Sequence, residues 1–147
     1  MQATAIPTTP KEIRERIRGR EIPGYTSGMA PGYVQANLVV LPKNLAFDFL
    51  LFCQRNPKPC PLIEVVETGS AEPLQTAPGA DIRTDLPRYR VYEYGEMVAE
   101  PEDISEYWRD DMVSFLLGCS FTFDAALTRA GISMRHVEQG TNVAMFI

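Results

Sequence analysis

The sequence is poor in the features that mark several large classes of protein. Lysine and arginine (14) are outnumbered by aspartate and glutamate (19), and the formal net charge is −5. A nucleic-acid or anionic-membrane partner would need a basic face, so neither is expected. The longest apolar runs, such as residues 113–117, fall far short of a membrane span. We recognise no internal repeat, low-complexity tract or secretory leader, and we expect a cytoplasmic protein.

Cysteine and histidine are scarce. The three cysteines cannot all pair with one another, and Cys53, Cys60 and Cys119 do not have the spacing of a zinc site. We therefore expect free thiols in a reducing compartment and no metal. The one histidine, His136, is either a general base or a solvated or structural side chain, and we prefer the second interpretation.

The remaining sequence is sufficient for one packed core. Apolar residues make up 45% and charged residues 22% of the chain, which are ordinary values for a globular protein. Strand-like and helix-like segments alternate, which predicts an α/β fold with a mixed sheet and flanking helices. Helices are expected at 9–19, 42–56, 101–117 and 123–130, and strands at 33–41, 62–66, 88–93, 96–99 and 142–147. The helix at 42–56 is apolar nearly all round, so we expect it to be buried.

Four polar clusters interrupt these apolar segments. They are Gln35 with Asn37, residues 53–58, residues 83–85 and residues 118–120. The second cluster begins a loop, 53–61, that three prolines stiffen and that carries two thiols, an arginine and a lysine. Such a loop is either a stiff connector or a scaffold for functional groups. If each cluster lies at the end of a strand or of a buried helix, all four could meet in one cleft.

Several side chains in these clusters have two chemical interpretations. Cys119 is a candidate nucleophile, but Thr122 stands where a serine-hydrolase elbow needs glycine, and a small buried thiol is the alternative. Arg55 and Arg83 can each dock a carboxylate through two parallel hydrogen bonds, or can form surface salt bridges. The two amides of the first cluster either satisfy nearby backbone groups or face a cleft.

Four longer motifs follow one another along the chain. They are residues 31–38 (PGYVQANL), 52–61 (FCQRNPKPCP), 83–87 (RTDLP) and 115–123 (FLLGCSFTF). Together they resemble the D-glutamate cyclase family, and the resemblance extends over about residues 10–143. It implies a hydro-lyase, a carbon–oxygen lyase that closes D-glutamate to 5-oxo-D-proline with loss of water. It also implies a family-specific α/β fold of two lobes.

The resemblance carries an expectation about domain organisation as well. Family members continue well beyond residues 142–143, so we expect a chain that is truncated at its C-terminus, with an incomplete second lobe. The predicted parts are an N-terminal helix with a glycine- and proline-rich arm at 1–30, an α/β domain at 31–117 and the start of the second lobe at 118–147. Whether this chain is active alone is left open, and so is formation of a homodimer.

The implied reaction gives a hypothetical role to each polar candidate. The substrate amine must lose a proton before it attacks the side-chain carboxyl carbon, and the negative carboxylates need partners. We expect Arg55, with Lys58 or Arg83, to bind a carboxylate. We expect Asp85 to accept the proton of the amine.

Hydrogen-bond donors would stabilise the developing oxyanion, and we assign Asn56, Gln35 and Ser120 to this task. The full candidate set is catalytic Asp85, Cys119 and Ser120, with substrate-binding Gln35, Asn37, Arg55, Asn56, Lys58 and Arg83. The scheme requires no metal and no organic cofactor, and its partner is a small amino-acid or carboxylate substrate. Two rival interpretations are a non-catalytic module that binds or senses a small acid, and a hydro-lyase that acts on a hydroxy acid.

Overall fold

The structure is a computed structural model that describes residues 9–141. The helices are α1 (Pro10–Arg18), α2 (Lys43–Arg55), a short 3-10 helix (Ser105–Tyr107), α3 (Phe121–Arg129) and α4 (Arg135–Glu138). The strands are β1 (Ala36–Pro42), β2 (Leu62–Val66), β3 (Val91–Glu93), β4 (Glu96–Ala99) and β5 (Met112–Gly118).

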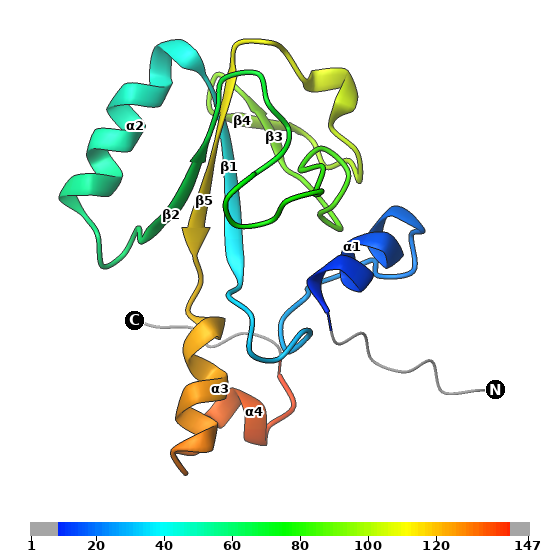
Figure 1. Ribbon diagram of the computed structural model, residues 1–147, viewed down its shortest axis with the longest axis vertical. Coiled ribbons are helices and arrows are strands. Elements are labelled where there is room, and N and C mark those ends of the chain that lie inside the picture. Colours follow the sequence, from blue (N-terminus) through cyan, green and yellow to red (C-terminus); the bar gives the residue numbers. More distant parts are fainter. Residues whose placement is uncertain (1–8, 142–147) are drawn as a thin grey trace.

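Strand β5 is the centre of a three-stranded sheet with the order β1-β5-β2 (Figure 1). Both neighbours run antiparallel to it, and Leu38 of β1 lies opposite Leu116 of β5. Strands β3 and β4 form a separate antiparallel hairpin. The predicted α/β class with flanking helices is confirmed. The sheet is antiparallel at every pairing within residues 9–141, so parallel pairing of the kind found in a mixed sheet does not occur there.

The two faces of this sheet carry different helices. Phe115 of β5 is fully buried, and its ring meets that of Phe49 in α2 edge-on, with centroids 4.9 Å apart. Successive side chains of a strand point to opposite faces, so Leu116 points away from α2. Figure 1 accordingly shows α1 and α2 on opposite sides of the sheet.

Helix α1 begins and ends where the sequence predicts. The Thr9 hydroxyl accepts a hydrogen bond from the Glu12 amide at 3.3 Å and so caps the helix. Ile13 and Ile17 lie on one face and are buried together with Ile22 and Ala30 from the following loop.

The prediction of a helix at 101–117 is wrong for most of its length. Only Ser105–Tyr107 form a single 3-10 turn, and Met112–Gly118 are the central strand β5. Val113, Ser114 and Phe115 are all buried, because a central strand is covered on both faces. Apolar and polar residues do not alternate in a strand that is buried on both faces. A short apolar run of this kind therefore cannot be distinguished from a buried helix by its periodicity.

The expectation that α2 is buried is also wrong. Its one buried residue is Cys53, and Phe47 is 71% exposed. The helix packs on the sheet through one side only, because nothing within residues 9–141 covers its other side.

After β5 the chain forms two short helices that are joined by a polar pair. The His136 ring nitrogen Nε2 lies 2.7 Å from the Asp124 carboxylate, which ties α4 to α3. His136 is buried, so the structural interpretation of this histidine holds. Thr122 lies inside α3, and its hydroxyl accepts a hydrogen bond from the backbone amide of Gln35 at 3.2 Å.

Several expectations lie beyond what the structure tests. The strand at 142–147 falls outside the described residues, and the predicted boundaries 1–30, 31–117 and 118–147 stay predictions. Within residues 9–141, no helix is both long and apolar enough to cross a membrane. In the same part of the chain, no three metal-ligating side chains gather at one place.

Candidate functional site

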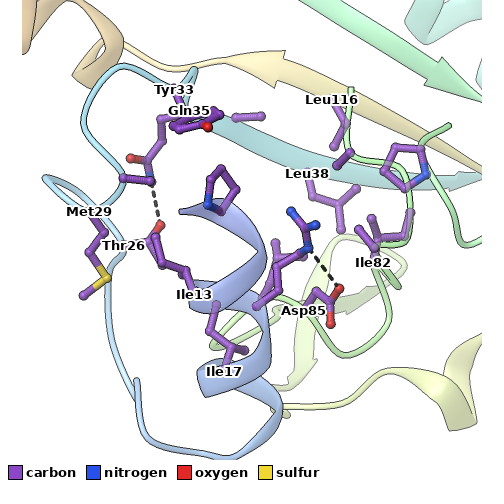
Figure 2. Close-up of a pocket in the computed structure, with 18 of the residues that line it drawn as sticks. Ile13, Ile17, Thr26, Met29, Tyr33, Gln35, Leu38, Ile82, Asp85 and Leu116 are labelled. Carbon is purple, nitrogen blue, oxygen red and sulfur yellow. Dashed lines mark hydrogen bonds and ion pairs between the residues drawn. The ribbon is translucent and has the colours of Figure 1, made fainter. Parts of the chain in front are cut away.

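A pocket of about 260 Å³ lies between α1 and the sheet (Figure 2). We call it the α1 pocket. Its walls come from α1, from segment 26–36, from the loops at 73–87 and from Leu38 and Leu116 of the sheet. Most of the lining is apolar, and the polar side chains in it are Arg14, Thr26, Gln35 and Asp85. A mostly apolar hollow with a few fixed polar groups is typical of sites for small molecules.

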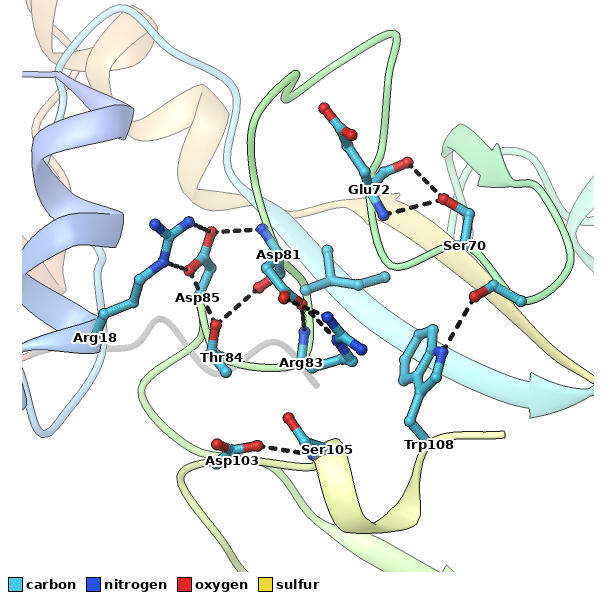
Figure 3. A network of polar contacts seen from close by, with 12 residues as sticks. Arg18, Ser70, Glu72, Asp81, Arg83, Thr84, Asp85, Asp103, Ser105 and Trp108 are labelled. Carbon is cyan, nitrogen blue, oxygen red and sulfur yellow. Dashed lines mark hydrogen bonds and ion pairs between the residues drawn. The ribbon is translucent and has the colours of Figure 1, made fainter. Parts of the chain in front are cut away.

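Asp85 is the most completely bonded residue of the pocket, and its side chain is only 2% exposed. Both of its carboxylate oxygens accept hydrogen bonds from the Arg18 guanidinium, the second at 2.7 Å (Figure 3). One oxygen also accepts the Asp81 amide at 2.8 Å. This carboxylate raises the pKa of Arg18. The contacts fasten α1 to the 81–89 turns, so Asp85 holds one wall of the pocket in place.

Arg14 is the second charged group of the pocket. Its Nε lies 3.6 Å from an Asp85 oxygen, at ion-pair distance, and its side chain is 18% exposed. This nitrogen is buried and has no hydrogen-bond partner within the described part of the chain. A buried donor without an acceptor costs about 1–3 kcal/mol. A ligand carboxylate in the pocket would supply the missing acceptor.

Gln35 and Thr26 form the polar group on the other side of the pocket. The Gln35 amide nitrogen Nε2 donates to the Thr26 hydroxyl at 2.7 Å, as Figure 2 shows. The backbone carbonyl of Gln35 accepts a hydrogen bond from the backbone amide of Cys119 at 3.1 Å. Gln35 precedes β1, whereas Asn37 lies within the strand opposite Leu117 and is exposed. Of the two amides of the first cluster, Gln35 lines the α1 pocket and Asn37 does not.

A polar hollow adjoins the pocket on the far side of Asp85. It is lined by Arg18, Asp81, Arg83 and Thr84, among others. The Arg83 guanidinium donates to both Asp81 oxygens, at 2.9 and 2.7 Å, and this contact holds the pKa of Asp81 below its usual value. Arg83 is thus already paired with a carboxylate of its own chain.

Three candidates lie at or just after the end of α2, which is on the other side of the sheet from α1, a wall of the α1 pocket (Figure 1). Asn56 caps its own helix, since its Nδ2 donates to the Phe52 carbonyl at 2.8 Å. Arg55 and Lys58 are exposed, and neither forms an ion pair with any residue of 9–141. The structure does not bring these three residues to Asp85, and their assigned roles stay predictions.

Cys119 and Ser120 follow the end of β5. The backbone amide of Gly118 donates to the Pro61 carbonyl at 2.8 Å, so the 53–61 loop reaches this end of β5. Cys119 is half-buried, and Ser120 is exposed with no side-chain bond to the first turn of α3. The first and fourth clusters therefore adjoin through a backbone bond, and the loop that contains the second cluster reaches the same end of β5 at Pro61, while residues 83–85 lie beside α1. Of the nine candidates, the α1 pocket contains Gln35 and Asp85.

Arg14 and Thr26 line the pocket and are absent from the candidates taken from the sequence. One sequence signal for Arg14 exists. Arg14 and Arg18 are four residues apart and so lie on one face of α1, beside the apolar pair Ile13 and Ile17. Two cations beside the buried isoleucines of a helix indicate that the surface against which the helix packs carries a carboxylate.

These observations define a small α/β protein with an arginine and a carboxylate at one end of an apolar pocket. The profile of the D-glutamate cyclase family matches residues 113–147 of this chain.

Curated relatives are similar to this chain over almost its whole length. A provisionally named hydro-lyase of Rubrobacter xylanophilus is 64% identical over 136 residues, which are 92% of this chain and 52% of the relative. Provisionally named hydro-lyases of Streptomyces avermitilis and Bacillus subtilis are 60% and 58% identical, over 95% and 93% of this chain. The alignments cover 50% and 53% of those two proteins. The chain thus spans about half the length of the curated relatives it matches.

Proposed function

We propose that this chain forms part of a hydro-lyase that closes D-glutamate to 5-oxo-D-proline. The observation that carries the proposal is 58–64% identity to three relatives named as hydro-lyases, over nearly all of this chain. The substrate comes from the name of the family. A small pocket lined by an arginine whose Nε lacks a hydrogen-bond partner within residues 9–141 is in keeping with an acidic substrate of this size.

The reaction moves two protons and exchanges one bond for another. The amine nitrogen attacks the side-chain carboxyl carbon, so a carbon–nitrogen bond forms and one carbon–oxygen bond breaks. The ammonium group gives up two protons in becoming the ring amide, and the departing oxygen takes up two and leaves as water. The protein must therefore orient the amine and screen the negative charge of the two carboxylates. It must also pass protons from the amine to the departing oxygen.

Arg14 is the residue of the pocket best suited to hold the carboxylate that does not react. Its free Nε is directed by the ion pair with Asp85, which in turn is fixed by Arg18. In this arrangement Asp85 orients Arg14. The proposal also keeps Asp85 as the base that accepts the proton of the amine. It keeps Asn56 and Ser120 as hydrogen-bond donors to the developing oxyanion. Gln35 and Thr26 offer a polar contact at the opposite side of the pocket.

The test is to measure binding of D-glutamate by calorimetry, together with loss of primary amine over time. Arg14→Gln should weaken binding by ~10-fold or more, because a hydrogen bond to a charged group contributes about 1.5–3 kcal/mol. The matched control is Arg20→Gln, since the side chain of Arg20 is 79% exposed and forms its ion pair with Glu102 at the surface. This control should bind as the unchanged chain does.

Each outcome has a defined meaning. Binding together with loss of amine supports the proposal, and L-glutamate reports its stereochemistry. Binding without loss of amine favours the acid-binding module. New absorbance from an unsaturated acid, with a panel of hydroxy acids, favours the other hydro-lyase. If D-glutamate neither binds nor reacts, or if Arg14→Gln binds it unchanged, the proposal is contradicted.

A further inference from the structure

The antiparallel pairing of β2 with β5 continues past the start of β2. Leu62, the first residue of β2, lies opposite Leu117 of β5. One step further, the Pro61 carbonyl accepts the Gly118 amide at 2.8 Å. A Cβ on Gly118 would lie 3.1 Å from Cγ of Pro61. Pro61 therefore lies opposite Gly118, and the register of the two strands is kept for this additional pair.

The next pair in the same register consists of two cysteines, Cys60 and Cys119. Cys60 precedes a proline, which restricts its backbone to extended conformations. Cys119 still follows the course of β5, because its amide donates to the Gln35 carbonyl beside β1 at 3.1 Å. The Pro61–Gly118 pair carries the hydrogen bond, so the cysteines occupy a non-hydrogen-bonded position. In a regular ladder the Cα atoms at such a position are about 4.5 Å apart, and a disulfide needs about 4.4–6.8 Å.

The alternation of side chains places both thiols on the α2 side of the sheet. Residues two or four apart along a strand share one face, so Cys119 shares the face of Phe115, whose ring meets α2. Cys60 likewise shares the face of Leu62, opposite Leu117. Both cysteines are free and half-buried, so a small reagent can reach them.

Cys53 is the competing partner for Cys60. It lies near the end of α2 and is 1% exposed. Burial raises the pKa of its thiol, and the nearby charge of Cys60 adds to this effect. A thiol attacks a disulfide as its thiolate and needs access to it. Cys53 is therefore the least reactive of the three cysteines.

We propose that Cys60 and Cys119 form a disulfide when the folded chain meets a small disulfide such as oxidised glutathione. One cysteine thiolate attacks the reagent, so a mixed disulfide forms and one glutathione leaves. The other cysteine thiolate attacks the mixed disulfide, the bond between the two cysteines forms, and the second glutathione leaves. The cysteine pair is oxidised and oxidised glutathione is reduced, and the two thiol protons end on the two glutathione molecules.

Such a bond links two of the polar clusters found in the sequence. The 53–61 loop carries Arg55 and Lys58, and Cys119 is followed by Ser120 at the start of α3. Oxidation therefore fixes the second cluster against the fourth, whichever reaction the chain takes part in.

The experiment incubates the reduced chain with oxidised glutathione, alkylates the remaining thiols and maps the cysteine peptides by mass spectrometry. We expect Cys53 to stay free and the peptides of Cys60 and Cys119 to be joined. The same treatment in concentrated urea is the matched control. Cys53 and Cys60 are seven positions apart, whereas Cys119 lies 59 positions beyond Cys60. Loop closure in the unfolded chain favours the shorter loop by ~10-fold or more, so the bond should change to Cys53–Cys60.

Three variants test the pairing directly. Cys53→Ala should still form the bond, whereas Cys60→Ser and Cys119→Ser should each stop at a mixed disulfide with glutathione. The melting temperature of each reduced variant shows whether it folds, and the maps of the unchanged chain with and without urea decide the question if one does not. A folded chain that joins Cys53 to Cys60, joins two copies or stops at mixed disulfides would overturn the proposal.

Discussion

Tyr89 is a residue whose single hydroxyl group holds two turns together. It donates to the Ile82 carbonyl at 2.8 Å and accepts the Leu86 amide at 3.1 Å. The side chain is buried, and burial raises the pKa of this hydroxyl. Tyr89→Phe would leave both backbone groups without that partner, so we expect the free energy of unfolding in urea to fall by ~1–3 kcal/mol. The exposed Tyr94→Phe is the control, and an equal effect of the two would contradict this account.

The Asp81–Arg83 pair makes stability depend on pH in the acid range. The hydrogen bond from Arg83 holds the pKa of Asp81 below its usual value of 3.8. A lowered pKa in the folded state contributes stability that is present above 3.8 and is lost as the pH falls through the folded-state value. Asp81→Asn should therefore lower the melting temperature at neutral pH and flatten its decline below about pH 4.

The effect should be small, since both side chains are about one third exposed. Asp48→Asn is the control, because Asp48 is exposed on α2 and forms no ion pair with the described residues. Thermal unfolding of the three proteins between about pH 2 and 7 measures the difference. An acid branch of Asp81→Asn as steep as that of the unchanged chain would refute the assignment.

Whether a site residue can be predicted from the sequence depends on how far along the chain its partner lies. The Thr9 cap is a local pattern and could be predicted from four consecutive residues. Asp85 could be chosen as a polar candidate, but its partner Arg18 lies 67 positions away. That pairing exists only because the fold brings α1 beside the 81–89 turns. Arg14 could not be predicted as a site residue for the same reason, because its partner Asp85 is far from it in the sequence.

At the scale of elements, Gly69 fixes the loop after β2 against the segment that leads into β5. Its φ of +80° suits glycine, and a Cβ at this position would lie 2.8 Å from the Asp110 carbonyl oxygen. Gly69→Ala should lower the free energy of unfolding by ~1–3 kcal/mol, through backbone strain and a clash. Gly79→Ala is the matched control, because its φ is +77° but no atom lies within 4 Å of the added Cβ. Equal losses in chemical denaturation would show that the contact with Asp110 does not matter.

Elements with local start and stop signals could be predicted, and the central strand could not. Proline and glycine delimit α1 and α2, and strand β2 and the β3–β4 hairpin also lie where the sequence predicts them. Strand β5 has no such signal, because it is buried on both faces and follows an acidic segment. Its place is set by pairing with β1 and β2, which are far away in the sequence.

At the scale of the whole molecule, the sheet separates the α1 pocket from helix α2. The α1 side holds the pocket with Arg14 and Asp85, and on the other side α2 packs through Phe49 and Cys53. Substitutions on one side should leave the other unaffected, because β5 lies between them and distant sites act independently.

The same arrangement predicts an uneven distribution of local stability. Strand β5 is bonded on both edges, and Ser114 and Phe115 within it are fully buried. The β3–β4 hairpin exposes Tyr92 and Met97 and joins no third strand within residues 9–141. A two-stranded hairpin of this kind is marginally stable alone. In hydrogen exchange followed by mass spectrometry, amides of β5 should exchange most slowly, and those of 91–99 should exchange early. Equal protection of the two regions would show that the hairpin is held by contacts other than its own strand pairing.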